Sequence, residues 1–151
     1  MIGVEAAIPN PALAPLQAVV GTWRTVGRHP YLPDTVLHGR TSFAWMDGGA
    51  FLVMRTEIDE PLIPSGIAII GSDDATGRFS MLYFDERGVS REYEVTIGDG
   101  VFTWSRNTPA FSQRFVCTIA PDGRSMSGKG EMSRDGAPWE KDLELDYTRE
   151  D

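Results

Sequence analysis

The sequence of 151 residues predicts an all-β fold, an antiparallel up-and-down β-barrel of about ten strands with a short N-terminal helix. Three observations favour this fold. Short runs of alternating apolar and polar residues follow one another from residue 22 onward, Gly- and Asp-rich breaks separate them, and no helical periodicity lies between them. Connections this short join antiparallel neighbours. A meander of about ten twisted strands tends to curl, and closure removes its edges.

The best helix candidate is the segment 9–21. Its apolar residues recur on one face, at Leu13, Leu16, Val19 and Val20. Prolines near its start suit the first turn of a helix, and the glycine at its end can stop one. Because a helix this short is marginal by itself, we expect it to pack against the rest of the domain.

Ten strands are predicted after this helix, at residues 22–26, 37–46, 51–58, 66–72, 78–85, 90–97, 101–106, 112–120, 125–133 and 139–149. Six of the breaks between them supply Gly or Asp where a turn needs positive φ, at 47–49, 74–77, 86–88, 98–100, 121–123 and 134–136. Two connections, 27–36 and 59–65, are longer and rich in proline. They are the candidates for the mouth or the lid of the barrel.

Composition and charge restrict the classes of function. The length suits one domain spanning residues 1–151. Acidic residues number 22 against 14 Lys and Arg, so the chain repels phosphate backbones and nucleic acid is not an expected partner. A lone Cys117 excludes an internal disulfide and is expected to be a buried, inert thiol. No signal peptide or membrane span is visible, so we expect a cytoplasmic, bacterial-type protein.

The segment Gly21, Thr22, Trp23 directly follows the predicted helix and opens the first strand. Gly-x-Trp in this place, with a ten-strand meander after it and Arg149 on the last strand, resembles the calycin superfamily of lipocalins, fatty-acid-binding proteins and nitrobindin-like barrels. The resemblance covers almost the whole chain and is closest to uncharacterised bacterial lipocalin-like proteins. It implies that Trp23 plugs one barrel end and that Arg149 stacks across it, a cation–π contact of about 0.5–2 kcal/mol.

The chain departs from these families at two points. Nitrobindin-like barrels hold haem through a histidine on a late strand, whereas the only histidines here, His29 and His38, are both early. The second and third lipocalin motifs are not recognisable. The resemblance therefore indicates a fold more than a function, and no cofactor is predicted.

The strand faces predict a set of ligand-binding residues. Pointing the apolar face of each strand inward places aromatic side chains and a few polar groups on one inner wall, namely Tyr83, Asp85, Arg91, Tyr93, Trp104, Arg106 and Gln113, which Phe43 and Trp45 can join from the second strand. All of these except Asp85 and Phe43 are predicted to bind the ligand. His29, in the first long connection, could contact a ligand at the mouth. Such a wall suits a small-molecule pocket, and arginine suits a carboxylate or phosphate. The resemblance to ten-strand fatty-acid binders implies an acidic ligand with an apolar tail.

Each of these residues also has a structural interpretation. Arg91 could pair with Asp85 across the turn at 86–88, and Trp104 and Tyr93 could simply fill the core. His29 could be an exposed loop residue, and two histidines without cysteine partners are no metal pattern. No catalytic Ser-His-Asp order is recognisable.

The leading hypothesis is a non-enzymatic protein, monomeric or homodimeric, that binds a small hydrophobic or amphipathic molecule inside the barrel. One alternative is a cofactor-free enzyme acting on a small hydrophobic metabolite, with His29 or Tyr93 as acid or base. A titratable pair within hydrogen-bond reach would favour it. Further alternatives are a haem- or nitric-oxide-binding barrel and a barrel packed solid that serves as a surface for a partner.

Overall fold

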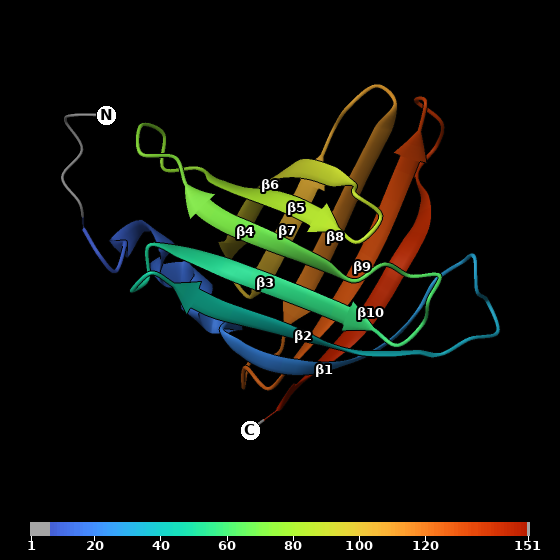
Figure 1. The fold of residues 1–151 in the computed structure, drawn as a ribbon, viewed down its shortest axis with the longest axis horizontal. Helices are drawn as coiled ribbons and strands as arrows, with labels where there is room; N and C mark the ends of the chain where they lie inside the picture. The colour runs from blue at the N-terminus through green and yellow to red at the C-terminus, as the bar shows by residue number, and fades with distance from the viewer. Residues whose placement is uncertain (1–6, 151) are drawn as a thin grey trace.

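The computed structural model describes residues 7–150 and confirms an antiparallel barrel of ten strands that closes by pairing β1 with β10 (Figure 1). The elements are η1 (Pro11–Val19), β1 (Gly21–Arg28), β2 (Leu37–Met46), β3 (Phe51–Ile58), β4 (Gly66–Ser72), β5 (Phe79–Asp85), β6 (Ser90–Gly98), β7 (Val101–Arg106), β8 (Phe111–Ile119), β9 (Ser125–Arg134) and β10 (Glu140–Glu150). All ten predicted strands are present. Among the described residues, no helix has the length and hydropathy that a membrane crossing requires.

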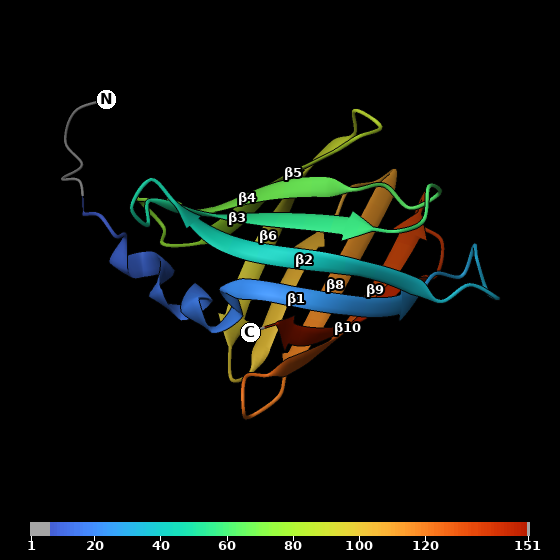
Figure 2. The same cartoon turned by 60° about the horizontal axis from the view of Figure 1, so that its bottom comes forward.

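The predicted N-terminal helix is present as the 3₁₀-helix η1, which lies against one end of the barrel (Figure 2). Leu13, Leu16 and Val19 are fully buried and three residues apart, which matches the three residues per turn of a 3₁₀-helix. The side chain of Asn10 caps the helix by accepting a hydrogen bond from the Ala12 amide at 3.0 Å. The helix therefore closes this end of the barrel with one apolar row.

Trp23 and Arg149 join η1 to the barrel. The indole of the fully buried Trp23 donates to the Val19 carbonyl at 2.9 Å, and the Arg149 guanidinium carbon lies 4.1 Å from the Trp23 ring centroid. Arg149 also donates to the carbonyls of Ala18 and Val20, at 3.0 and 2.5 Å. These bonds satisfy carbonyls that the end of a helix leaves without partners. The predicted cation–π contact is present.

The glycine of Gly-x-Trp has a steric role at this junction. Gly21 has a φ of +134°, and a β-carbon at this position would lie 2.5 Å from Nη1 of Arg149. Only glycine combines that backbone conformation with that close approach. The glycine of the Gly-x-Trp motif is therefore required for Arg149 to stack on Trp23.

Aromatic rings fill the middle of the barrel, and glycines on β9 make room for them. Trp104 stacks on Phe115 with ring centroids 4.6 Å apart. Phe115 in turn covers Gly128, where a β-carbon would lie 2.6 Å from two ring carbons. We call the end of the barrel opposite η1 the distal end; it lies beyond these rings. The distal end carries the connections 29–36, 59–65, 86–89, 107–110 and 135–139.

We expect Arg149→Met to lower the free energy of unfolding by about 2–4 kcal/mol, because it leaves several carbonyls without their charged donor. Arg40→Met is the control. The Arg40 side chain is 63% exposed and pairs with Glu150 at the surface, so its loss should cost less than about 1 kcal/mol. Urea unfolding at unchanged m-value measures both. Equal losses in the two variants would contradict the structural role of Arg149.

We expect Gly128→Ala to destabilise the protein by about 1–3 kcal/mol, since the new methyl group overlaps the Phe115 ring. Gly98→Ala, in β6, is the matched control because no atom lies within 4 Å of its added β-carbon. Its stability should stay unchanged or rise by up to about 1 kcal/mol. Thermal unfolding compares the two, and near-UV circular dichroism reports the packing of Trp104. A loss at Gly98 as large as at Gly128 would refute the steric explanation.

Candidate ligand-binding site at the distal end

Most of the predicted ligand-binding residues lie together at the distal end. Tyr83, Arg91, Tyr93, Arg106, Gln113 and His29 are linked there by ring contacts, hydrogen bonds or strand pairing. Trp104 lies deeper, stacked on Phe115. Trp45 lies apart from this cluster, near η1, where its indole donates to Oε1 of Gln17 at 2.9 Å.

A chain of hydrogen bonds runs across this end of the barrel. The Tyr93 hydroxyl donates to Oε1 of Gln113, and Nε2 of Gln113 donates to Oδ2 of Asp142 at 2.7 Å. The other oxygen of Asp142 lies 3.0 Å from Nε2 of His29. The Tyr31 amide donates to Nδ1 of His29 at 3.1 Å, so the proton of the neutral ring must reside on Nε2 and point at Asp142. This chain ties the connection 29–36 to strands β6, β8 and β10.

Asp142 reaches this chain because of a β-bulge. Lys141 pairs with Glu131 and Glu144 pairs with Lys129, so two residues, 142 and 143, lie opposite the single residue Gly130. A β-carbon on Gly130 would lie 2.6 Å from the Leu143 carbonyl oxygen, so the glycine makes room for the bulge. The bulge turns Asp142 inward until it is buried. Regular alternation from Leu145 and Tyr147 predicts an outward side chain at position 142, so Asp142 is not among the residues predicted from the sequence.

The two arginines of the cluster have no carboxylate partner among the described residues. The Arg91 guanidinium carbon lies 4.7 Å from the Phe111 ring centroid, and that of Arg106 lies 5.9 Å from the Tyr93 ring centroid. Nε of Arg106 is buried without a hydrogen-bond acceptor. The alternative pairing of Arg91 with Asp85 is absent, because Asp85 binds other groups.

Asp85 is held by Arg87 and Tyr83. Nη2 of Arg87 and the Tyr83 hydroxyl each donate to Asp85 Oδ2 at 2.7 Å. Burial alone would raise the pKa of Asp85, but the hydrogen bonds from Arg87 and Tyr83 lower it to about 2. Burial and the bond to Asp85 raise the pKa of Tyr83. At neutral pH, Asp85 is therefore an anion already occupied by its own neighbours, and Tyr83 is a neutral phenol.

Tyr93 stands between the two arginines. Burial raises the pKa of Tyr93, while a hydrogen bond with Arg91 and the charges of Arg91 and Arg106 oppose the rise. The phenol is neutral at physiological pH, so it contributes no negative charge to balance them. The local charge of this part of the distal end is therefore positive, in a chain with a formal net charge of -8.

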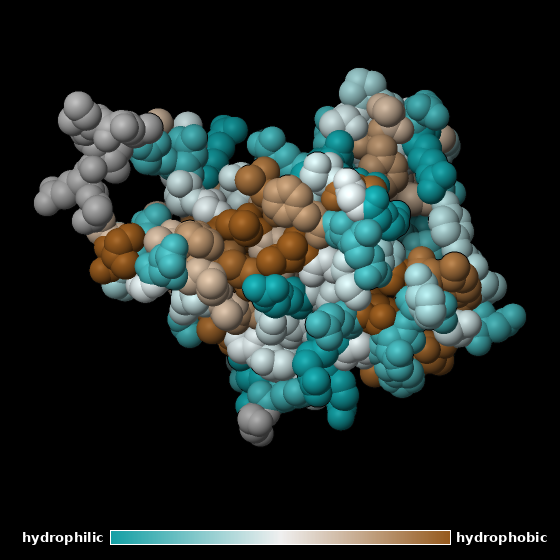
Figure 3. All heavy atoms as spheres, in the orientation of Figure 1, coloured by the Kyte–Doolittle hydropathy of each residue, from teal (hydrophilic) through white to brown (hydrophobic). Residues whose placement is uncertain are grey.

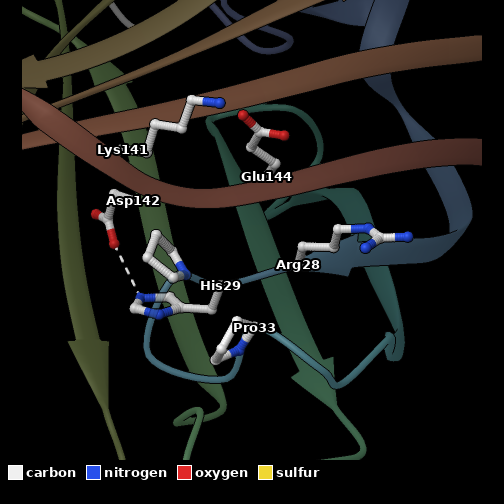
Figure 4. Close-up of a pocket in the computed structure, with 7 residues that line it drawn as sticks. Arg28, His29, Pro33, Lys141, Asp142 and Glu144 are labelled. Atoms are coloured by element: carbon white, nitrogen blue, oxygen red, sulfur yellow. Dashed lines mark hydrogen bonds and ion pairs between the residues drawn. The ribbon is translucent and has the colours of Figure 1, made fainter.

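A shallow hollow of about 260 Å³ opens beside the His29–Asp142 pair (Figure 4). It lies between the ends of β1 and β10, and in the close-up the side chains of Arg28 and Lys141 point away from the pair. His29 has both ring nitrogens engaged, by Asp142 and by the Tyr31 amide. The pair holds the loop in place, and it leaves no ring nitrogen free to accept a proton from a substrate.

The chain matches no protein-family model and no curated protein in sequence. Among solved structures it is similar to the crystal structure of Rv2717c from M. tuberculosis, with a TM-score of 0.64 and 16% sequence identity. The match covers 93% of this chain and 98% of that chain. A likeness at this identity shows a shared barrel fold and carries no residue roles.

We expect Asp142→Ala to lower the free energy of unfolding by about 2–3 kcal/mol, because it leaves donors on His29 and Gln113 without their acceptor. Faster hydrogen exchange of the Tyr31 amide should accompany this loss, since the amide depends on a fixed His29 ring. Glu144→Ala, on the same strand, should change stability by less than about 0.5 kcal/mol. A Tyr31 amide that is equally protected in both variants would contradict the role of Asp142.

Proposed function

We propose that the protein binds a small, largely apolar molecule that carries an acidic group. The acidic group is bound by Arg91 and Arg106, and the apolar part extends toward the barrel interior. The observation that carries this proposal is Arg106, whose Nε is buried without an acceptor within residues 7–150, beside a second arginine that has no carboxylate partner in that range either. Burying an N–H donor of a charged group is unfavourable unless an acceptor binds it, and the anionic group of a ligand would be such an acceptor.

The two nearby carboxylates already have other partners, so neither binds Arg91 or Arg106. Asp85 is bound by Arg87 and Tyr83, and Asp142 is bound by His29 and Gln113. Planar guanidinium groups bind the two oxygens of a carboxylate in parallel, which suits a ligand acid better than a neutral polar group.

The apolar part of the ligand would meet aromatic side chains. The rings of Tyr83 and Tyr93 meet edge to face with centroids 6.3 Å apart, and Trp104 lies further toward the interior among the partly buried residues that pack on the core. Aromatic walls with a few polar groups at one end favour an amphipathic ligand that enters tail first. This supports a fatty acid or an aromatic acid rather than a small polar acid.

Neither catalysis nor haem binding finds equal support. The titratable pair that would favour an enzyme, His29 with Asp142, is present, but both nitrogens of His29 already have partners. His38, the other histidine, is exposed and lies on the outward face of β2. The residues at the distal end therefore do not fit a histidine-bound haem inside the barrel.

The binding test compares a long-chain fatty acid with its methyl ester and an aromatic acid with its amide, by displacement of a fluorescent lipid probe. We expect each acid to bind saturably and at least about tenfold more tightly than its uncharged counterpart, because only the acid can form ion pairs with the two arginines. Arg106→Met should abolish most of that difference. Arg114→Met is the matched control, because Arg114 pairs with Glu131 away from this cluster.

Three outcomes would contradict the proposal. One is the absence of saturable binding by any compound. Another is equal affinity for acid and ester, which would remove the role of the arginines. The third is an equal loss of affinity in Arg114→Met, which would trace the effect to overall charge.

A further inference from the structure

Two buried side-chain polar atoms have no hydrogen-bond partner among the residues that the structure describes, and they lie on facing walls of the barrel. One is Nε of Arg106 on β7, and the other is Oγ1 of Thr25 on β1. In the closed order of strands, β1 lies five positions from β6 in both directions, and β7 adjoins β6. The wall that carries Thr25 therefore faces the wall that carries Arg91 and Arg106.

The Thr25 side chain points into the barrel. Polar side chains lie mostly on the outer surface, where Figure 3 shows teal and pale spheres around brown ones on one face. Thr25 is instead fully buried, between the exposed residues Arg24 and Val26 of the same strand. Its hydroxyl lies close to Gly39, the residue opposite on β2, where an added β-carbon would lie 3.0 Å from Oγ1. Because Gly39 has no side chain, no side-chain partner is available from this position.

The neighbouring hydroxyl groups already have partners. Tyr147, opposite Thr25 on β10, donates a hydrogen bond to the sulfur of Cys117. Thr41 on β2 and Thr56 on β3 bind each other through hydroxyl oxygens 3.2 Å apart. A buried hydroxyl without a partner is unfavourable, and a threonine hydroxyl can both donate and accept. Thr25 therefore has a hydrogen-bonding group that no described part of the chain uses.

We infer that the ligand carries a second polar group, a hydroxyl or a carbonyl oxygen on its apolar part, and that this group binds the Thr25 hydroxyl. The inference rests on the proposed function, because the acidic group at Arg91 and Arg106 fixes one end of the ligand. From there the apolar part crosses the barrel toward the facing wall. A site with an unpaired polar group discriminates against a ligand that lacks the matching group. The ligand class narrows from apolar acids to oxygenated ones, such as hydroxy or keto fatty acids.

The test compares octadecanoic acid with its monohydroxylated isomers, by displacement of a fluorescent lipid probe. We expect at least one isomer to bind about three- to tenfold more tightly than octadecanoic acid, as one added hydrogen bond would allow. In Thr25→Val, which keeps the shape of the side chain, this gain should disappear while octadecanoic acid binds as tightly as before. Thr41→Val is the matched control. The preference should persist there, because the Thr41 hydroxyl is already bound by Thr56.

Thermal unfolding without ligand gives an independent readout. Thr25→Val removes a buried hydroxyl that has no partner in the described chain, so Tm should rise by about 2–4 °C. Thr41→Val should not raise Tm, because it takes the partner away from the Thr56 hydroxyl.

Different results would overturn this inference and the proposed function. If neither octadecanoic acid nor any isomer binds saturably, the acid-binding function is wrong, and this inference fails with it. If octadecanoic acid binds and no isomer gains affinity, or if the preference survives in Thr25→Val, only this inference fails. A higher Tm in Thr25→Val without any preference in the wild type would also overturn it and assign the hydroxyl to a buried water molecule.

Discussion

The guanidinium of Arg149 and the indole of Trp23 lie across the strand pair, β1 with β10, that turns the sheet into a barrel. Arg149 stacks on Trp23, donates hydrogen bonds to the carbonyls at the end of η1 and links the last strand to the first. The helix, the closed end and the seam therefore depend on one contact. The distal end does not contribute to this contact, and its polar groups bind the connection 29–36 to the strands instead.

The two ends of the barrel treat buried charge in different ways. At the plug, Arg149 is satisfied by backbone carbonyls. At the distal end, Asp142 and Asp85 are satisfied by side chains, while Arg91 and Arg106 have no carboxylate partner in the part of the chain that the structure describes. A protein that maximised stability alone would pair or remove such arginines, because an unanswered buried donor is unfavourable. Their retention at one end is what makes that end a binding site in our proposal.

The fold could be predicted because it rests on local signals. Turn residues such as Asp99 and Gly100, both with positive φ, mark where strands reverse, and period-two alternation assigns their faces. The Arg149–Trp23 contact followed from a family resemblance and from that alternation. The position of Trp45 near η1 could not be read in this way, because alternation assigns a face but not a depth in the barrel. Asp142 was hidden for a different reason, since a bulge breaks the alternation that the prediction assumes.

The bulge at residues 142 and 143 divides β10 into two segments with independent phase. After it, Leu145, Tyr147 and Arg149 follow the pattern of the closed end, and within it Asp142 turns toward the distal end. A substitution of Asp142 can therefore alter the polar chain at the distal end while the residues that follow the bulge keep their register. The polar chain at the distal end and the closure of the barrel are therefore separable properties of one strand.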